Sequence, residues 1–420
     1  MNSKSLLKNF LALTAGTANQ LLIQIFTVPI FLLRVDPGTY ATWLVAYNIA
    51  LFTTMLDFGQ ITASQNSFHL LATRHQNDVI RNRTSQISSF IAISFVLYFF
   101  ALVVFGIVLH LSYSIPLCGI FILLNFIQSY FGLVEATARA YGRTGLGIYI
   151  SNLLRFSEFL GIIFGLIVFP NSLVMVAVCA LTLKVLVLLM TSQLLGNKLQ
   201  IIRFVIPRIT TLKRTLREGL PFLTYKASEW LLVSGTAILL QSRTSPEIFI
   251  LFITSRTFFR LGWQIASLIS STYALEMSAA WGRNDLHGTR QLARRSLIAT
   301  ASCGMFGNLV YFYQGNTIYN LWTHNQIQLG KYLLLLGTLY SFLISFSYAQ
   351  KAIFHAINKN LRVSLISIGF AILVNVIIYV MNSHITIDAI YLILVSAEFI
   401  SIPIIYLISR KLFISNFNIR

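Results

Sequence analysis

The chain has 420 residues, of which 56% are apolar and 10% are charged, and its mean hydropathy is +0.75. A soluble domain carries roughly 25% charged residues, so this chain has too few charges to cover a soluble surface, and it is too apolar to be disordered. The net charge is +19, but the basic residues lie between apolar blocks. That pattern indicates loops at an anionic membrane face and excludes nucleic acid as the expected partner.

Twelve apolar stretches are long enough to cross a bilayer as helices, which requires about 20 mostly apolar residues each. We therefore predict an all-α polytopic membrane protein. The second, eighth and tenth spans are the longest and are expected to tilt or to project beyond the bilayer. The spans are expected at 10–33, 40–66, 87–110, 114–138, 147–169, 171–194, 219–240, 247–276, 291–313, 326–354, 362–382 and 386–408.

The basic residues between the spans predict the orientation of the chain. The termini and the even-numbered connections hold 23 of them, whereas the odd-numbered connections hold only Arg34, Arg243 and Lys331. Because basic loops stay in the cytoplasm, both termini are predicted to be cytoplasmic.

A basic connection over 201–218 separates six spans from six. We predict an N-terminal lobe over 1–200 and a C-terminal lobe over 219–420. A weak internal repeat supports this division, because Arg74 and Arg81 recur as Arg283 and Arg290 at a constant offset of 209 residues. Two six-span halves in the same orientation are parallel repeats, and substrate is expected at their interface.

Charged residues inside spans are costly, at about 2.5–3.5 kcal/mol each at the bilayer centre, and they therefore mark partners or cavities. Arg155 and Glu158 are three residues apart on one helix, which favours a local ion pair. Lys226 and Glu229 have the same spacing, which fits either a local pair or a Lys226 that binds a substrate anion. The eight charged residues that lie well inside a span are Arg155, Glu158, Lys184, Lys226, Glu229, Arg256, Arg260 and Glu398.

Arg256 and Arg260 share one helix face, and a polar stripe continues from them through Gln264, Ser267 and Ser271. Two like charges four residues apart repel each other. The pair is interpreted as an anion site at membrane depth, because arginine is suited to bidentate phosphate contact. The alternative is an ion pair to another helix, with Glu398 as the candidate partner.

The first span carries an uncharged polar stripe through Gln20 and Gln24. Either helix–helix hydrogen bonds or a water-filled lumen explains it. No nucleotide-binding or metalloprotease motif occurs. The three cysteines and seven histidines have no ligand spacing, so no metal and no cofactor are expected.

Several short motifs now indicate a family. An apolar run over 28–34 ends in Arg34, a Gly-x-Tyr-x-x-Trp turn follows at Gly38, and Leu-Asp-Phe-Gly closes the second span at 56–59. This resembles the Wzx-type O-antigen flippases, the polysaccharide transporter branch of the multidrug/oligosaccharidyl-lipid/polysaccharide exporters.

The resemblance implies two six-helix lobes around a V-shaped cavity lined by spans one, two, seven and eight. It implies flipping of an undecaprenyl-diphosphate-linked oligosaccharide across the bacterial inner membrane, for lipopolysaccharide biosynthesis. The expected partners are this lipid-linked oligosaccharide, membrane lipids, an H⁺ or Na⁺ counter-ion and polysaccharide polymerases. The candidate substrate-binding residues are Lys226, Arg256, Arg260, Gln20 and Gln24, and the candidate ion-coupling residues are Glu229, Glu158 and Glu398.

Two other classes are compared with this one. A multidrug antiporter of the same fold should hold an acidic residue in an apolar cavity, whereas the charges inside these spans are net positive. A membrane enzyme of polysaccharide assembly, such as a polymerase or ligase, usually carries a large external catalytic loop, which the predicted topology lacks. A flippase of the fourteen-span kind does not match twelve spans. The chain is therefore expected not to be an enzyme.

Overall fold

The computed structural model describes residues 3–64, 68, 77–108, 115–141, 144–195, 205, 209–283, 285–357, 359–381 and 386–415. These residues form helices and the turns between them, with no strand among them. The chain divides into two compact units, Met1–Trp230 and Leu231–Arg420. The predicted all-α polytopic architecture is confirmed. The proposed boundary at 201–218 remains a prediction, and residues 201–204 and 206–208 within it lie outside the described part.

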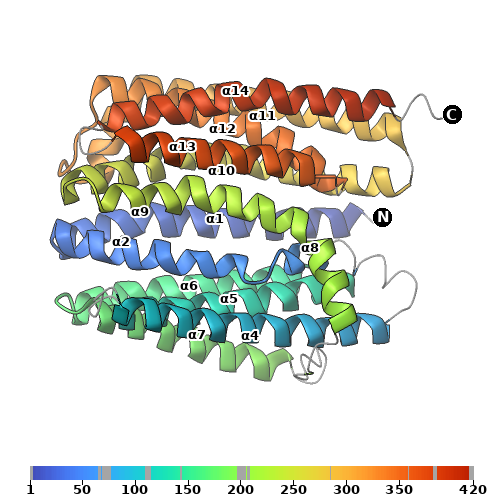
Figure 1. Ribbon diagram of the computed structural model, residues 1–420, viewed down its shortest axis with the longest axis horizontal. Helices are drawn as coiled ribbons and strands as arrows, with labels where there is room; N and C mark the ends of the chain where they lie inside the picture. Colours follow the sequence, from blue (N-terminus) through green and yellow to red (C-terminus); the bar gives the residue numbers. More distant parts are fainter. Residues whose placement is uncertain are drawn as a thin grey trace. The chain divides into compact units, whose positions relative to one another are not determined.

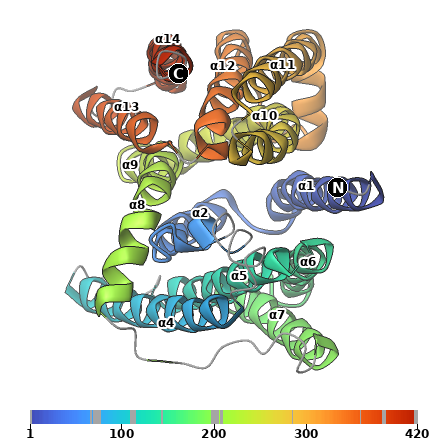
Figure 2. The same ribbon diagram turned by 90° about the vertical axis from the view of Figure 1, so that its right-hand side faces the viewer.

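The first unit is built on α5 (Ile115–Ala140) and α6 (Thr144–Val168). The helix α6 packs against α7 (Leu173–Leu195) and α1 (Ser3–Arg34), while α5 packs against α4 (Asn77–Val108) and α2 (Pro37–Leu51), as Figure 1 and Figure 2 show. A Cβ added at Gly161 or Gly165 would lie 2.5–2.6 Å from a Cα of α7. These glycines therefore let α6 and α7 approach closely, as small residues do in membranes.

Two helices of the first unit are interrupted or bent. The second predicted span consists of α2, a 3₁₀ segment η1 (Phe52–Met55), a turn, and helical residues at 60–64. The helix α8 (Ile209–Trp230) contains Pro221 and is visibly bent in Figure 1. A proline inside a helix removes a hydrogen bond and clashes with the preceding turn.

The second unit begins with a π-helical segment, η3 (Leu231–Gly235), which leads into α9 (Thr236–Gln241). Its core is α10 (Pro246–Gly282), α11 (Leu286–Trp322) and α12 (Lys331–Ala356), which pack against one another. Then α14 (Ile387–Ser415) packs on α12, and α13 (Leu361–Met381) packs on α14 and η3. The helices α10 and α11 have 37 residues each. At 1.5 Å per residue they measure about 55 Å, longer than the hydrocarbon core, so both project beyond it.

Eight described helices are long and apolar enough to span a membrane. The second, seventh, eighth and ninth predicted spans are not among these eight. The second is broken by η1 and the seventh by η3, while α10 carries two arginines in mid-helix and α11 is strongly basic in its first turns. These four predicted spans contain either a break in the helix or charged residues, in addition to their apolar residues.

Candidate functional site

Lys226 of α8 forms an ion pair with Asp57 within the first unit. Its Nζ lies 2.8 and 2.9 Å from the two carboxylate oxygens of Asp57. The Asp57 side chain is 1% exposed and that of Lys226 is 29% exposed. The local pair between Lys226 and Glu229, one of the two interpretations of their spacing, is wrong. Glu229 is exposed and instead accepts a hydrogen bond of 2.6 Å from the hydroxyl of Tyr225.

The break in the second span explains why Asp57 is available to Lys226. Its carboxylate accepts hydrogen bonds from the backbone N–H groups of Gly59 and Ile61, at 3.0 and 3.4 Å, and so caps the helical turn that follows. Gly59 has a φ of +72°, and a Cβ there would lie 2.3 Å from the carbonyl oxygen of Gly219. The close contact of this turn with α8 brings Lys226 to the carboxylate.

A second buried ion pair joins Lys184 of α7 to Glu158 of α6. The Nζ of Lys184 lies 2.6 Å from the Glu158 carboxylate and 3.0 Å from the carbonyl oxygen of Leu124. The side chain of Lys184 is 1% exposed. The predicted Arg155–Glu158 pair is therefore wrong, and Arg155 is exposed instead. Buried Lys184 needs a counter-charge more strongly than exposed Arg155 does.

Arg256 lies buried at the π-helical segment of the second unit. Its guanidinium donates to the carbonyl oxygen of Val233 and lies 5.2 Å from the ring of Phe252. A π-helical turn shifts the backbone hydrogen-bond register and leaves carbonyl groups in need of donors. Asn375 of α13 meets the same need, because its amide donates to the carbonyl oxygen of Leu231 at 3.0 Å.

Arg260 lies one turn further along α10 and is partly exposed. Its guanidinium lies 4.9 Å from the ring centre of Trp263. Glu398, the candidate partner of the two arginines, forms no ion pair with either within the described residues. The structure thus distinguishes the two arginines. The guanidinium of Arg256 donates a hydrogen bond to a backbone carbonyl oxygen, whereas the charge of Arg260 is not neutralised by a described carboxylate.

The remaining candidates lie apart from these pairs. On α1, Gln20 is exposed and Gln24 is partly buried. On α14, Glu398 is 6% exposed and accepts a hydrogen bond of 3.2 Å from Ser401. No group of three metal-ligating side chains occurs among the described residues.

Sequence reasoning missed three of these features. Asp57 is not among the candidate residues from the sequence, because its partner lies 169 residues away. The Lys184–Glu158 pair joins two helices, so no spacing on one helix indicates it. The π-helical segment has no signal in the hydropathy pattern.

No protein-family model and no curated protein matches the chain. Solved structures do match its fold. A MATE structure in complex with MaD3S has a TM-score of 0.74 at 14% identity, covering 98% of this chain and 96% of that one. An outward-facing multidrug resistance MATE family transporter of the MOP superfamily has a TM-score of 0.71 at 13% identity, covering 99% and 97%.

A third similar structure is a MOP superfamily transporter from Pyrococcus furiosus, described as having a binding pocket of reverse polarity that suggests a different function. Its TM-score is 0.68 at 13% identity, covering 98% of this chain and 95% of that one. The chain therefore has the fold of the MATE transporters of the MOP superfamily. It is a multi-pass membrane protein with this fold.

Proposed function

We propose that the chain is a membrane transporter that works by alternating access and not an enzyme. The observation that supports this is the match of nearly the whole chain to MATE structures in outward-facing and inward-facing conformations. Buried charges that are paired within the helices also fit a protein that encloses water at membrane depth. Both termini are proposed to be cytoplasmic, in a bacterial inner membrane, with the lobes divided at 201–218.

Multidrug export is the first candidate activity, because similar structures are described as multidrug resistance transporters. Such a substrate is an amphiphilic organic cation, which needs a carboxylate beside aromatic rings. Glu229 provides an exposed carboxylate on α8, next in sequence to Trp230. The Asp57 carboxylate is less suitable, because Lys226 already neutralises it.

Flipping of a lipid-linked oligosaccharide is the second candidate, and the charge of Arg260 favours it. No described carboxylate pairs with Arg260, so its guanidinium is available to a diphosphate. The reverse polarity described for the Pyrococcus furiosus transporter supports the view that this fold accepts pockets of different charge. Arg256 is less suited to binding a diphosphate, because its guanidinium already donates to the carbonyl oxygen of Val233.

The two candidates are separated by measuring both transport activities on the same proteoliposomes. One assay follows efflux of ethidium, and the other follows translocation of an undecaprenyl-diphosphate-linked oligosaccharide. Drug export predicts that Glu229→Gln abolishes efflux. Flipping predicts that Arg260→Ala abolishes translocation while protein abundance stays unchanged, and that Arg260→Lys retains part of it.

Arg256→Ala is the matched control for Arg260→Ala, since both arginines lie on one face of α10. Because Arg256 satisfies the Val233 carbonyl, its loss should lower the abundance of folded protein, with activity falling only in proportion. A fully active Arg260→Ala variant would remove the oligosaccharide proposal. Absence of both transport activities from well-folded wild-type protein would remove the proposal that it transports either class of substrate.

A further inference from the structure

One turn of α10 is hydrogen-bonded to a side chain of α11. In a regular α-helix the N–H group of residue 262 donates directly to the carbonyl oxygen of residue 258. Here the hydroxyl of Tyr311 accepts a hydrogen bond from the N–H of Gly262 at 2.9 Å and donates one to the carbonyl oxygen of Phe258 at 2.8 Å. The hydroxyl is therefore bonded to both of the backbone groups that a regular helix joins to each other.

Packing holds the Tyr311 hydroxyl in this position. The ring centre of Tyr311 lies 4.9 Å from that of Phe258 and 5.7 Å from that of Phe259, and the residue is 8% exposed. A Cβ added at Gly262 would lie 2.9 Å from the Tyr311 ring. The glycine thus lets the ring come close enough for its hydroxyl to reach the backbone of α10.

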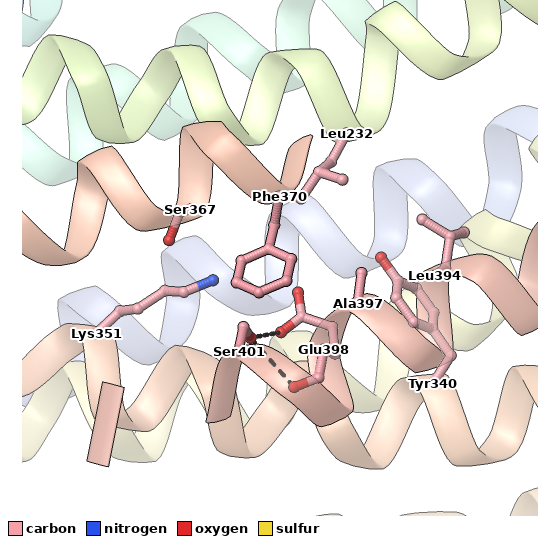
Figure 3. A pocket seen from close by; sticks show the side chains of 9 residues that line it. All are labelled: Leu232, Tyr340, Lys351, Ser367, Phe370, Leu394, Ala397, Glu398 and Ser401. Atoms are coloured by element: carbon pink, nitrogen blue, oxygen red, sulfur yellow. Dashed lines mark hydrogen bonds between the residues drawn. The ribbon is translucent and has the colours of Figure 1, made fainter. Parts of the chain in front are cut away.

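A second hydroxyl contacts the same turn from α12. Ser341 donates to the carbonyl oxygen of Phe259 at 2.9 Å, whereas its neighbour Tyr340 lines the cavity among α12, α13, α14 and η3 that Figure 3 shows. Two consecutive carbonyl groups of α10 therefore accept hydrogen bonds from other helices. Side chains inserted into the hydrogen-bond ladder bend a helix, and such irregular backbone persists at membrane depth only where polar partners satisfy it.

The turn that these two hydroxyls contact contains Arg260. One turn earlier, the Arg256 guanidinium donates to the carbonyl oxygen of Val233, whereas the Arg260 guanidinium lies 4.9 Å from the ring centre of Trp263. Two residues four apart on a regular α-helix lie on the same face. A hinge in the turn over 258–262 accounts for the different neighbours of the two arginines.

We propose that Tyr311 is a positioning residue for Arg260. Its hydroxyl replaces the direct hydrogen bond between Gly262 and Phe258, and the hinge that results sets the direction of the Arg260 guanidinium. When the two backbone groups bond to each other instead, the turn closes into regular helix and Arg260 turns with it. The consequence for transport rests on the proposed binding of a diphosphate by Arg260, whereas the hinge itself is testable without transport.

The test of the hinge is amide hydrogen exchange, measured by mass spectrometry on the purified full chain in detergent. Tyr311→Phe keeps the ring and removes only the hydroxyl, so Gly262 becomes able to donate directly to Phe258. Exchange of the amides over 258–264 should then slow by about fivefold or more, because a direct bond replaces a bridged one. The Tm should stay unchanged.

A hydroxyl that only bridges two fixed backbone groups gives the opposite result. Its removal would leave a buried N–H and a buried carbonyl unsatisfied, so exchange would become faster and the Tm would fall. That outcome would overturn the proposal, as would failure of Tyr311→Phe to accumulate as folded protein.

Tyr319→Phe is the matched control, because Tyr319 lies on the same helix and is fully buried. Its hydroxyl is bonded to the side chain of Thr254 at 2.7 Å and not to the backbone over 258–262. Loss of this hydroxyl should leave the exchange over 258–264 unchanged. A slowing as large as that in Tyr311→Phe would show that any lost hydroxyl between α10 and α11 has this effect, which would also overturn the proposal.

The positioning role is tested by transport on the same variants. Tyr311→Phe should lower translocation of the lipid-linked oligosaccharide to the level of Arg260→Ala, and the double variant should show no further loss, because both changes act on one group. Normal translocation by a Tyr311→Phe protein with slowed exchange would overturn the positioning role. Absence of translocation from wild-type protein counts against the proposed function, and the exchange measurement then decides on the hinge by itself.

Discussion

At the scale of single residues, four of the charged groups inside the predicted spans neutralise one another in pairs. Lys226 pairs with Asp57, and Lys184 pairs with Glu158. Each pair joins two different helical segments of the first unit. Removing one partner of a buried pair leaves an uncompensated charge and costs more than removing both. These pairs therefore hold segments of the first unit together, and the charge of Lys226 is already neutralised by Asp57.

Lys226→Ala and Asp57→Asn should each destabilise the protein, by about 3 kcal/mol, because each leaves its partner unpaired. This value is at the lower end of the range for buried pairs, since the Lys226 side chain is 29% exposed. The double variant should recover part of the loss. The measurement is thermal unfolding in detergent, with Glu229→Gln as a control that leaves the pair intact. Strictly additive losses in the double variant would contradict the pairing.

At the scale of secondary-structure elements, two of the predicted spans contain an irregular segment that holds polar groups in contact with neighbouring elements. The second span breaks at η1 and the following turn, where Asp57 and Gly59 lie. The seventh continues from α8 into the π-helical η3, whose carbonyl groups accept from Arg256 and Asn375. Irregular backbone at membrane depth is tolerated only where side chains or water satisfy it. Both irregular segments meet this condition through polar partners on neighbouring elements.

Gly59→Ala should be strongly destabilising, by about 2–5 kcal/mol, because it combines a left-handed backbone conformation with overpacking. The added Cβ would lie 2.3 Å from the carbonyl oxygen of Gly219, and that backbone cannot move without shifting α8. Gly282→Ala is the control, since a Cβ there meets nothing within 4 Å. Membrane abundance and Tm of the two variants provide the comparison. A normal Tm for Gly59→Ala would show that the turn does not pack against α8 in this way.

At the scale of the whole molecule, hydropathy and loop charge determine how the chain threads the membrane. The spans α1, α4 to α7 and α12 to α14 are apolar enough to insert on composition alone. The helix α2 has 15 residues and is too short to span a bilayer by itself. The helices α8, α10 and α11 carry charged residues and depend on neighbouring helices to cover them, as polar residues in membrane helices generally do.

The predicted topology can be tested with single cysteines in a background without Cys118, Cys179 and Cys303. Cysteines that replace Thr39, Ser245 and Asn325 should react with an impermeant thiol reagent added outside, because they lie in the weakly basic connections. Cysteines that replace Arg208 and Asn284 should react only after the membrane is opened. External labelling of Arg208→Cys in sealed cells is the result that would reverse the predicted orientation.

The sequence by itself determined the features that depend on local composition. Twelve apolar stretches, separated by turn residues and basic loops, were enough to predict an all-α polytopic protein, and each stretch overlaps helices among the described residues. Burial of apolar side chains in lipid depends on the hydropathy of about 20 consecutive residues, which can be read directly from the chain. The boundaries were less accurate where charged or polar residues extend a helix, as at the start of α4 and at both ends of α11.

Only the tertiary structure decided which charges meet. The spacings of Arg155 with Glu158 and of Lys226 with Glu229 predicted local pairs, yet both acids have other neighbours. A buried charge gains most from a partner that lies with it in the low-dielectric interior, and that partner came from another segment in both buried ion pairs. The same reason separates Arg256, buried against a π-helical carbonyl, from Arg260, although the sequence presents them as equivalent.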